Sequence, residues 1–241
     1  MNLDILVFAA HPDDAELTMG GTISKLTKNN LKAGIIDLTR GELGTRGNAD
    51  IRQEEAVKAA GVMGIMIREN LQIPDGSVEV TVENVHKVVI ALRKYRPKFI
   101  FAPYFNDRHP DHVNTSKLVK RSLFTSGLNK FKTFEKEAPQ HPYRPAKLYY
   151  YMQAYTFEPS FIIDISDTFE TKMKAVRSYS TQFYNPKSNE PDTFISSPEF
   201  IANVEARAKF YGFQIGKKYG EPFYSEEKVE LNLVGLLKSI K

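Results

Sequence analysis

Two short clusters of histidine and aspartate hold the residues of this sequence that are best suited to chemistry. The first is His11-Pro12-Asp13-Asp14 and the second is His109-Pro110-Asp111-His112, and together they contain three of the chain's five histidines. Zinc accepts imidazole nitrogen and carboxylate oxygen, and a catalytic zinc keeps three protein ligands and an open position for water. His11, Asp14 and His112 supply such a set. We therefore interpret the clusters as halves of one site for a single zinc ion, although these ligands also suit other divalent metals.

The other residues of the two clusters suggest a metal-assisted hydrolysis. Zinc lowers the pKa of a coordinated water molecule to ~7 and polarises a carbonyl group. A nearby carboxylate must then accept a proton, and Asp13 is the natural general base, while its alternative role is a helix N-cap. His109 could donate to the developing oxyanion or protonate the leaving amine, and Asp111 could orient His109 or a ligand histidine. The predicted reaction is the hydrolysis of an amide or an ester.

The positions of the clusters favour a metal site over the alternative, in which each histidine is an ordinary hydrogen-bonding or surface residue. The first cluster follows the apolar run Ile5-Leu6-Val7-Phe8, and the second follows Phe99-Ile100-Phe101-Ala102. Both runs are typical of buried strands. Open α/β sheets bind ligands outside the carboxyl ends of their strands, which is where both clusters would lie.

Apolar periodicity predicts alternating strands and helices in the first half of the chain. We expect strands over 3–9, 32–39, 65–67 and 98–102, and helices over 15–27, 50–63, 78–95 and 112–124. This order indicates an α/β fold of the Rossmann-like, doubly wound kind, with a mostly parallel sheet and helices on both faces. Right-handed crossovers would place the loops after the first and fourth strands at the same edge of the sheet.

The pattern is looser in the second half of the chain. We expect strands over 146–152 and 161–165, helices over 168–179 and 199–213, a long loop or packing arm over 181–198, and a weak helix over 226–241. The prediction is one domain over residues 1–241, with the metal site in a core of residues 1–128. Residues 129–241 would add strands, helices and a C-terminal cap, whose aromatic residues would equally suit an oligomer interface.

Two glycine-rich stretches are candidates for ligand binding. Gly20-Gly21 lies inside a predicted helix and matches neither G-x-G-x-x-G nor a P-loop, so we expect close packing there and no nucleotide phosphate. The loop over 39–47 contains three glycines, which suits either a close approach of backbone to a ligand or an ordinary flexible connection.

Composition narrows the classes of protein. The 241 residues are 41% hydrophobic and 26% charged, which is typical of a folded globular chain. The absence of cysteine removes disulfides, thiolate ligands and a thiol nucleophile. The net charge is +4, and the basic and acidic residues are interspersed along the chain. This pattern predicts no nucleic-acid partner, but the positive balance would favour an anionic small substrate. No apolar run of ~18 residues and no signal-peptide pattern occur, which predicts no membrane partner and a cytoplasmic location.

The paired clusters make this sequence similar to the PIG-L/LmbE-like zinc-dependent N-acetylglucosaminyl deacetylases. The loop over 39–47 matches the substrate loop of that family. Five stretches further along the chain resemble the branch that removes acetate from N-acetylglucosaminyl-malate in bacillithiol biosynthesis. They are His141-Pro142-Tyr143-Arg144-Pro145, Tyr149-Tyr150-Tyr151-Met152, Glu158-Pro159-Ser160-Phe161, Ser180-Thr181-Gln182-Phe183-Tyr184 and Gly220-Glu221-Pro222-Phe223.

The resemblance implies a role for each residue of the clusters and for three others. It implies that His11, Asp14 and His112 bind zinc, that Asp13 is the base, and that His109 is an electrostatic stabiliser and acid. It implies that Arg52 contacts the sugar or the leaving acetate, and that Glu42 and Tyr184 lie near the sugar.

The resemblance also implies a substrate and an assembly. The substrate would be a small anionic aminosugar glycoside, with N-acetylglucosaminyl-malate as the leading example, and the enzyme would be a homo-oligomer, often a hexamer built from trimers. The open alternatives are the same chemistry on a chitooligosaccharide or a mycothiol-type conjugate, a non-catalytic Rossmann module that binds nucleotide, and an inactive metal-binding scaffold.

Overall fold

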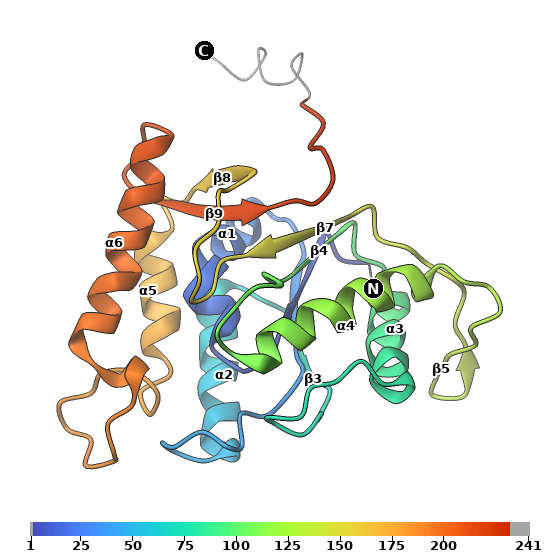
Figure 1. Cartoon of the computed structure of the whole chain (residues 1–241), viewed down its shortest axis with the longest axis horizontal. Helices are drawn as coiled ribbons and strands as arrows, with labels where there is room; N and C mark the ends of the chain where they lie inside the picture. Colours follow the sequence, from blue (N-terminus) through green and yellow to red (C-terminus); the bar gives the residue numbers. More distant parts are fainter. Residues whose placement is uncertain (1, 232–241) are drawn as a thin grey trace.

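A seven-stranded sheet runs through the chain, and Figure 1 shows the computed structural model, which describes residues 2–231. In sheet order its strands are β3 (Ile67–Asn70), β2 (Ala33–Asp37), β1 (Ile5–Ala9), β4 (Phe99–Pro103), β7 (Lys147–Tyr151), β9 (Gly220–Tyr224) and β8 (Phe161–Asp164). The strands from β3 to β7 are parallel to their neighbours, whereas β9 is antiparallel to both β7 and β8. The predicted mostly parallel α/β sheet is confirmed.

Helices cover both faces of this sheet because its inner strands are apolar on both sides. In β1, Val7 and Ala9 belong to one apolar core while Leu6 and Phe8 belong to the other, and all four are fully buried. The first core includes residues of α1 (Asp14–Lys28), α2 (Ala49–Met63), α5 (Phe169–Arg177) and α6 (Pro198–Gln214). The second core includes residues of α3 (Val82–Tyr95) and α4 (Pro110–Ser126).

The chain changes direction across the sheet between β1 and β4. β1 pairs with β2 on one side, where Ile5 is opposite Ala33, and with β4 on the other, where Ile5 is opposite Phe99. The loops that leave the carboxyl ends of β1 and β4 therefore lie at one edge of the sheet, as predicted. This is the topological switch point at which open α/β sheets bind ligands.

Two predicted elements of the first half begin later than expected. The helix predicted from residue 78 begins at Val82, because the Thr81 side chain accepts a hydrogen bond from the Asn84 amide (3.1 Å) and so caps it. Val78 instead lies buried in the second core. The strand predicted over 65–67 is β3, which begins at Ile67. Most other predicted boundaries differ by one or two residues, as helix and strand ends commonly do.

Residues 129–231 contribute three strands to the sheet. β9 was not predicted, because glycine and proline are uncommon in strands and β9 contains Gly220 and Pro222. The hairpin of β5 (Phe134–Glu135) and β6 (Ala138–Pro139) and the short helix η1 (Phe194–Ser196) were also not predicted. Of the helix predicted over 226–241, residues 226–231 are not helical, and 232–241 lie outside the described residues.

The paired glycines of α1 pack closely, as predicted. The helix is kinked at Met19 (φ −134°, ψ 19°), which frees the backbone amides that follow. The amides of Gly21 and Thr22 donate to the carboxylate of Glu221 on β9, at 3.0 and 2.7 Å. A Cβ atom on Gly21 would lie 2.7 Å from the Ile165 side chain, so only glycine fits without displacement. None of the helices within residues 2–231 combines the length and apolarity that a membrane-spanning segment needs.

Candidate metal centre

The loop after β1 and the first turn of α1 hold the first cluster. The backbone amide of His11 donates to Asp14 Oδ2 (2.9 Å), which fixes the carboxylate at the start of the helix. Asp13 stands at the N-cap position with φ 118°, in a backbone region that non-glycine residues rarely adopt. Its side chain makes no capping hydrogen bond and is free for another partner.

The start of α4 holds the second cluster. His109 is the N-cap residue and Pro110 occupies the first helical turn, where its missing N–H is not needed. The Nδ1 atom of His109 accepts a hydrogen bond from the Asp111 amide (3.2 Å), which leaves Nε2 as the N–H of a neutral imidazole. Burial, followed by the charges of His11 and His112, lowers the pKa of His109 and favours this neutral form.

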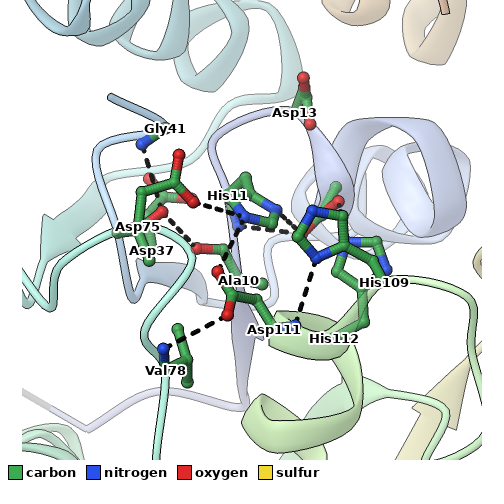
Figure 2. Close-up of polar contacts among 12 residues, drawn as sticks. Ala10, His11, Asp13, Asp37, Gly41, Asp75, Val78, His109, Asp111 and His112 are labelled. Atoms are coloured by element: carbon green, nitrogen blue, oxygen red, sulfur yellow. Dashed lines mark hydrogen bonds and ion pairs between the residues drawn. The ribbon is translucent and has the colours of Figure 1, made fainter. Parts of the chain in front are cut away.

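His11, Asp14 and His112 converge from the two loops, as the sequence predicted. Asp14 Oδ1 lies 3.3 Å from His112 Nε2, and Asp14 Oδ2 lies 3.6 Å from His11 Nδ1. The three residues offer ligand atoms that all lie within 4.8 Å of one another. Figure 2 shows the side chains of His11 and His112 close together at this place. Two imidazoles and one carboxylate at this spacing fit a divalent metal ion. A second grouping, of His11 with His109 and Asp111, shares one histidine with the first.

Three further carboxylates contact the outer nitrogens of the histidines. His11 Nε2 lies 3.0 Å from Asp75 Oδ1 and 3.4 Å from Asp111 Oδ2, and His112 Nδ1 lies 2.8 Å from Asp107 Oδ1. A carboxylate behind a ligand histidine fixes its ring orientation and tautomer. This arrangement leaves His11 Nδ1 and His112 Nε2 facing Asp14, and so favours the first of the two groupings.

Asp75 and Asp107 were not singled out in the sequence. The sequence feature that could have identified them is their position after a strand. Asp75 lies in the loop after β3 and Asp107 in the loop after β4, at the ligand-binding edge of the sheet. Asp111 was expected to orient either His109 or a ligand histidine. Its carboxylate contacts His11 and also accepts the amide of Gly76 (2.8 Å).

The histidines and carboxylates of this centre shift one another's pKa values. Burial by itself lowers the pKa of His112, but Asp14 and Asp107 outweigh burial and raise it to about 9. Burial likewise opposes the charged form of His11, and Asp111, Asp14 and Asp75 raise its pKa well above the ordinary value. Burial would raise the pKa of Asp14, but His112 and His11 hold it well below its usual range. The centre therefore favours positive charge between carboxylates, whether from protons or from a metal ion.

Asp13 and Arg52 form a buried ion pair beside this centre. Arg52 is on α2, and its Nη2 donates to Asp13 Oδ2 at 2.6 Å, while its Nη1 donates to the Gly41 carbonyl at 3.3 Å. Gly41 has a positive φ of 67°, and a Cβ atom there would collide with the Arg52 guanidinium. Burial raises the pKa of Asp13 to about 6, and Arg52 acts against this rise. Asp13 lies to one side of the histidines (Figure 2).

A cavity of about 880 Å³ opens over the metal centre and contains most of the predicted site residues. His11, Asp13, Asp14, Arg52, His109 and His112 line it. Glu42 and Tyr184 are not among the lining residues. Glu42 accepts the amides of Arg40 and Asp75, each at 3.0 Å, and Tyr184 is 50% exposed. Within the segment 181–198, whose role the sequence left open, Gln182, Thr193, Phe194 and Ile195 line the cavity.

The sequence that carries both clusters is similar to that of known proteins. The family model described as PIG-L, GlcNAc-PI de-N-acetylase, matches residues 6–123, a stretch that contains both clusters. The chain belongs to this PIG-L family. Over 229 residues it is 29% identical to the diacetylchitobiose deacetylase of Thermococcus kodakarensis, which is 90% of this chain and 80% of the relative.

Two further relatives of this PIG-L family chain are informative. The solved structure of the conserved protein TT1542 from Thermus thermophilus is 35% identical, with a TM-score of 0.85 over 95% of this chain and 97% of the other. The probable N-acetyl-alpha-D-glucosaminyl L-malate deacetylase 2 of Bacillus anthracis is 29% identical over 143 residues, 54% of this chain and 63% of the relative. The chain is thus an N-deacetylase of the PIG-L family, and His11, Asp14 and His112 offer it a possible metal site.

Proposed function

We propose that this PIG-L deacetylase removes the N-acetyl group of an N-acetylglucosaminyl glycoside, with zinc as the metal and N-acetylglucosaminyl-malate as the leading substrate. The observation that carries the proposal is the Asp13–Arg52 pair, which lies beside His11, Asp14 and His112 within one cavity. A buried carboxylate with a raised pKa beside a metal site is suited to moving a proton during hydrolysis.

The metal would be held by His11 Nδ1, a carboxylate oxygen of Asp14 and His112 Nε2. When bound, it supplies Lewis acidity, which lowers the pKa of water and polarises the acetamide carbonyl. Asp75 and Asp107 hold the two imidazole rings in place through their outer nitrogens. These contacts orient the ligand nitrogens before a substrate binds.

The residues of the chain supply the proton transfers. The water oxygen attacks the acetamide carbonyl carbon, and a carboxylate oxygen of Asp13 takes its proton. His109, neutral with its proton on Nε2, donates a hydrogen bond to the oxygen on which negative charge develops. When the carbon–nitrogen bond breaks, Asp13 returns the proton to the sugar nitrogen, so that a primary amine and acetic acid form. The acid then loses its remaining proton to solvent and leaves as acetate. Arg52 stays paired with Asp13 and holds its carboxylate in place.

The malate aglycone is supported by the downstream sequence stretches, by the Bacillus anthracis relative and by the guanidinium groups of Arg108 and Arg207 in the cavity. A second candidate substrate is diacetylchitobiose, because the Thermococcus kodakarensis relative covers most of the chain. The two differ in charge, since malate is a dianion and the second sugar of chitobiose is neutral.

Primary-amine release from zinc-loaded protein tests both candidates. N-acetylglucosaminyl-malate, diacetylchitobiose and free N-acetylglucosamine would be compared at equal concentration. We expect the highest kcat/KM for the malate glycoside. Faster release from diacetylchitobiose would reassign the substrate, and release from none of the three would reject the proposed function.

We also propose, from the family resemblance, that residues 1–241 act as one deacetylase domain and that the chain forms a homo-oligomer. Light scattering coupled to size-exclusion chromatography measures the mass in solution. A monomer at micromolar concentration would contradict the oligomer.

A further inference from the structure

Arg207 of α6 points a guanidinium group into the cavity without a carboxylate partner. Its Nη1 donates to the Gln153 carbonyl at 2.5 Å. Among residues 2–231, no carboxylate oxygen lies within 4.0 Å of a guanidinium nitrogen of Arg207, which is the limit for an ion pair. Burial lowers the pKa of this guanidinium, which reflects the cost of placing a positive charge there without compensation.

Gln153, whose backbone carbonyl accepts from Arg207, also has a side-chain hydrogen-bond donor without a partner. Gln153 is only 7% exposed and lines the cavity, and its Nε2 has no hydrogen-bond partner in the described part of the chain. A buried amide donor without a partner is energetically unfavourable, so such a group in a cavity points to a ligand acceptor. The guanidinium comes from α6 and this amide from the segment that follows β7, which are far apart in sequence.

The two other arginines that line the cavity each have a partner side chain. Arg52 is neutralised by Asp13 at 2.6 Å, and Arg108 lies 4.6 Å above the ring of Phe194. Arg207 therefore carries an uncompensated charge, and Gln153, whose carbonyl it contacts, carries a free donor in the same cavity. The Arg207 site is also linked to the metal centre, because the amide of Ala154, next to Gln153, donates to Asp107 Oδ2 at 2.8 Å, and Asp107 holds His112.

We propose that Arg207 and the Gln153 amide form a subsite for a carboxylate on the aglycone of the substrate. The proposal rests on the proposed function and deepens it, because it names residues that would select an anionic glycoside over a neutral one. A guanidinium binds carboxylate through directed, charge-assisted hydrogen bonds, and Gln153 Nε2 adds a neutral donor from the adjoining residue. A second sugar, as in diacetylchitobiose, would leave the charge of Arg207 uncompensated.

A specificity ratio tests the subsite. The ratio is kcat/KM for N-acetylglucosaminyl-malate divided by kcat/KM for the neutral methyl glycoside of N-acetylglucosamine. We expect Arg207→Met to lower the ratio by about 10-fold or more, since a buried charge pair is lost, and Arg207→Lys to lower it less. Gln153→Glu should also lower the ratio, because the new carboxylate would pair with Arg207 and repel the anion. Lys209→Met, on the same helix but in an exposed pair with Glu205, is the matched control for loss of one positive charge.

The same ratio separates the subsite from a structural role. If Arg207→Met lowered both kcat/KM values equally, Arg207 would act on the fold and the subsite would be rejected. An unchanged ratio in Gln153→Glu, together with an unchanged ratio in Arg207→Met, would reject it as well.

Direct binding distinguishes failure of the subsite from failure of the proposed function. Calorimetry on zinc-loaded Asp13→Asn protein, with and without Arg207→Met, would measure Kd for the two glycosides. An Arg207-dependent Kd for the malate glycoside alone would support the subsite, even if the wild-type protein released no amine. Amine release with an Arg207-independent Kd would keep the deacetylation and reject the subsite. Binding of neither glycoside would reject both.

Discussion

Arg52 Nη2 donates to Asp13 Oδ2 at 2.6 Å, so the residue that was expected to contact the sugar or the leaving acetate also contacts the candidate base. Both side chains are less than one-tenth exposed. The pair has two opposing effects on Asp13. Burial raises the pKa of the carboxyl group to about 6, and the neighbouring guanidinium limits that rise. Removal of Arg52 should therefore alter the pH range in which Asp13 can act as a base.

Arg52→Met should move the acid limb of the pH–rate profile to higher pH. Without the guanidinium the pKa of Asp13 rises, so the deprotonated form of the base is lost at a higher pH as the solution is acidified. Activity at pH 6 should fall more than activity at pH 8, with the profile measured as kcat against pH. Arg177→Met, an exposed arginine on α5, serves as the control. An acid limb at the wild-type position would mean that Arg52 does not tune Asp13.

Asp13→Asn should lower turnover by about 100-fold or more while zinc stays bound, because the amide cannot accept the proton. Zinc content by atomic absorption and turnover by amine release would be measured on the same preparation. Turnover close to the wild-type rate would remove Asp13 from the reaction and would favour an inactive or differently organised scaffold. Loss of zinc would instead show that Asp13 supports the ligand Asp14.

Zinc binding to the metal-free protein should release protons, so affinity should rise with pH. In that form the pKa of His112 is about 9, because Asp14 and Asp107 outweigh the effect of burial. Below this pH the ring carries a proton that a metal ion must displace. We expect Kd to tighten by about tenfold per pH unit for each proton displaced. Calorimetry in two buffers of different ionisation enthalpy counts the protons, and a count of zero at pH 7 would contradict the prediction.

Asp107→Asn and Asp75→Asn should each weaken zinc binding by about 10- to 100-fold, because an outer carboxylate orients each ligand histidine. Asp107 Oδ1 lies 2.8 Å from His112 Nδ1, and Asp75 Oδ1 lies 3.0 Å from His11 Nε2. Competition with a chelator of known affinity gives the Kd. Asp167→Asn changes an exposed aspartate and should leave the Kd as it is. Wild-type affinity in both outer variants would show that the rings are held by other contacts.

Gly21→Ala should destabilise the fold by about 1–3 kcal/mol, the usual range for overpacking, because the added Cβ would lie 2.7 Å from Ile165. Gly61→Ala is a matched change in α2, where nothing lies within 4 Å of the added atom. That variant should be neutral or stabilise by up to about 1 kcal/mol, since alanine favours helix more than glycine does. Denaturant unfolding gives both values. Equal effects at the two positions would show that α1 can shift to accommodate the methyl group.

Several features of the site could be predicted from short stretches of sequence. Each cluster is contiguous and follows an apolar run, so the position of its histidines at the end of a parallel strand follows from local periodicity. The pairing of β1 with β4 then brings His11, Asp14 and His112 together. Family membership followed from the same two motifs. Gly20-Gly21 was expected to pack closely because paired glycines in a helix otherwise destabilise it.

Only the tertiary structure decided the contacts between residues that are distant in the chain. The pairing of Arg52 with Asp13, the outer carboxylates Asp75 and Asp107, and the approach of Arg207 to Gln153 each join separate elements. No periodicity or motif encodes such contacts, because they depend on where whole helices pack on the sheet. For the same reason β9 could not be predicted, since its position is set by its pairing with β7 and β8 and not by the strand propensity of its own residues.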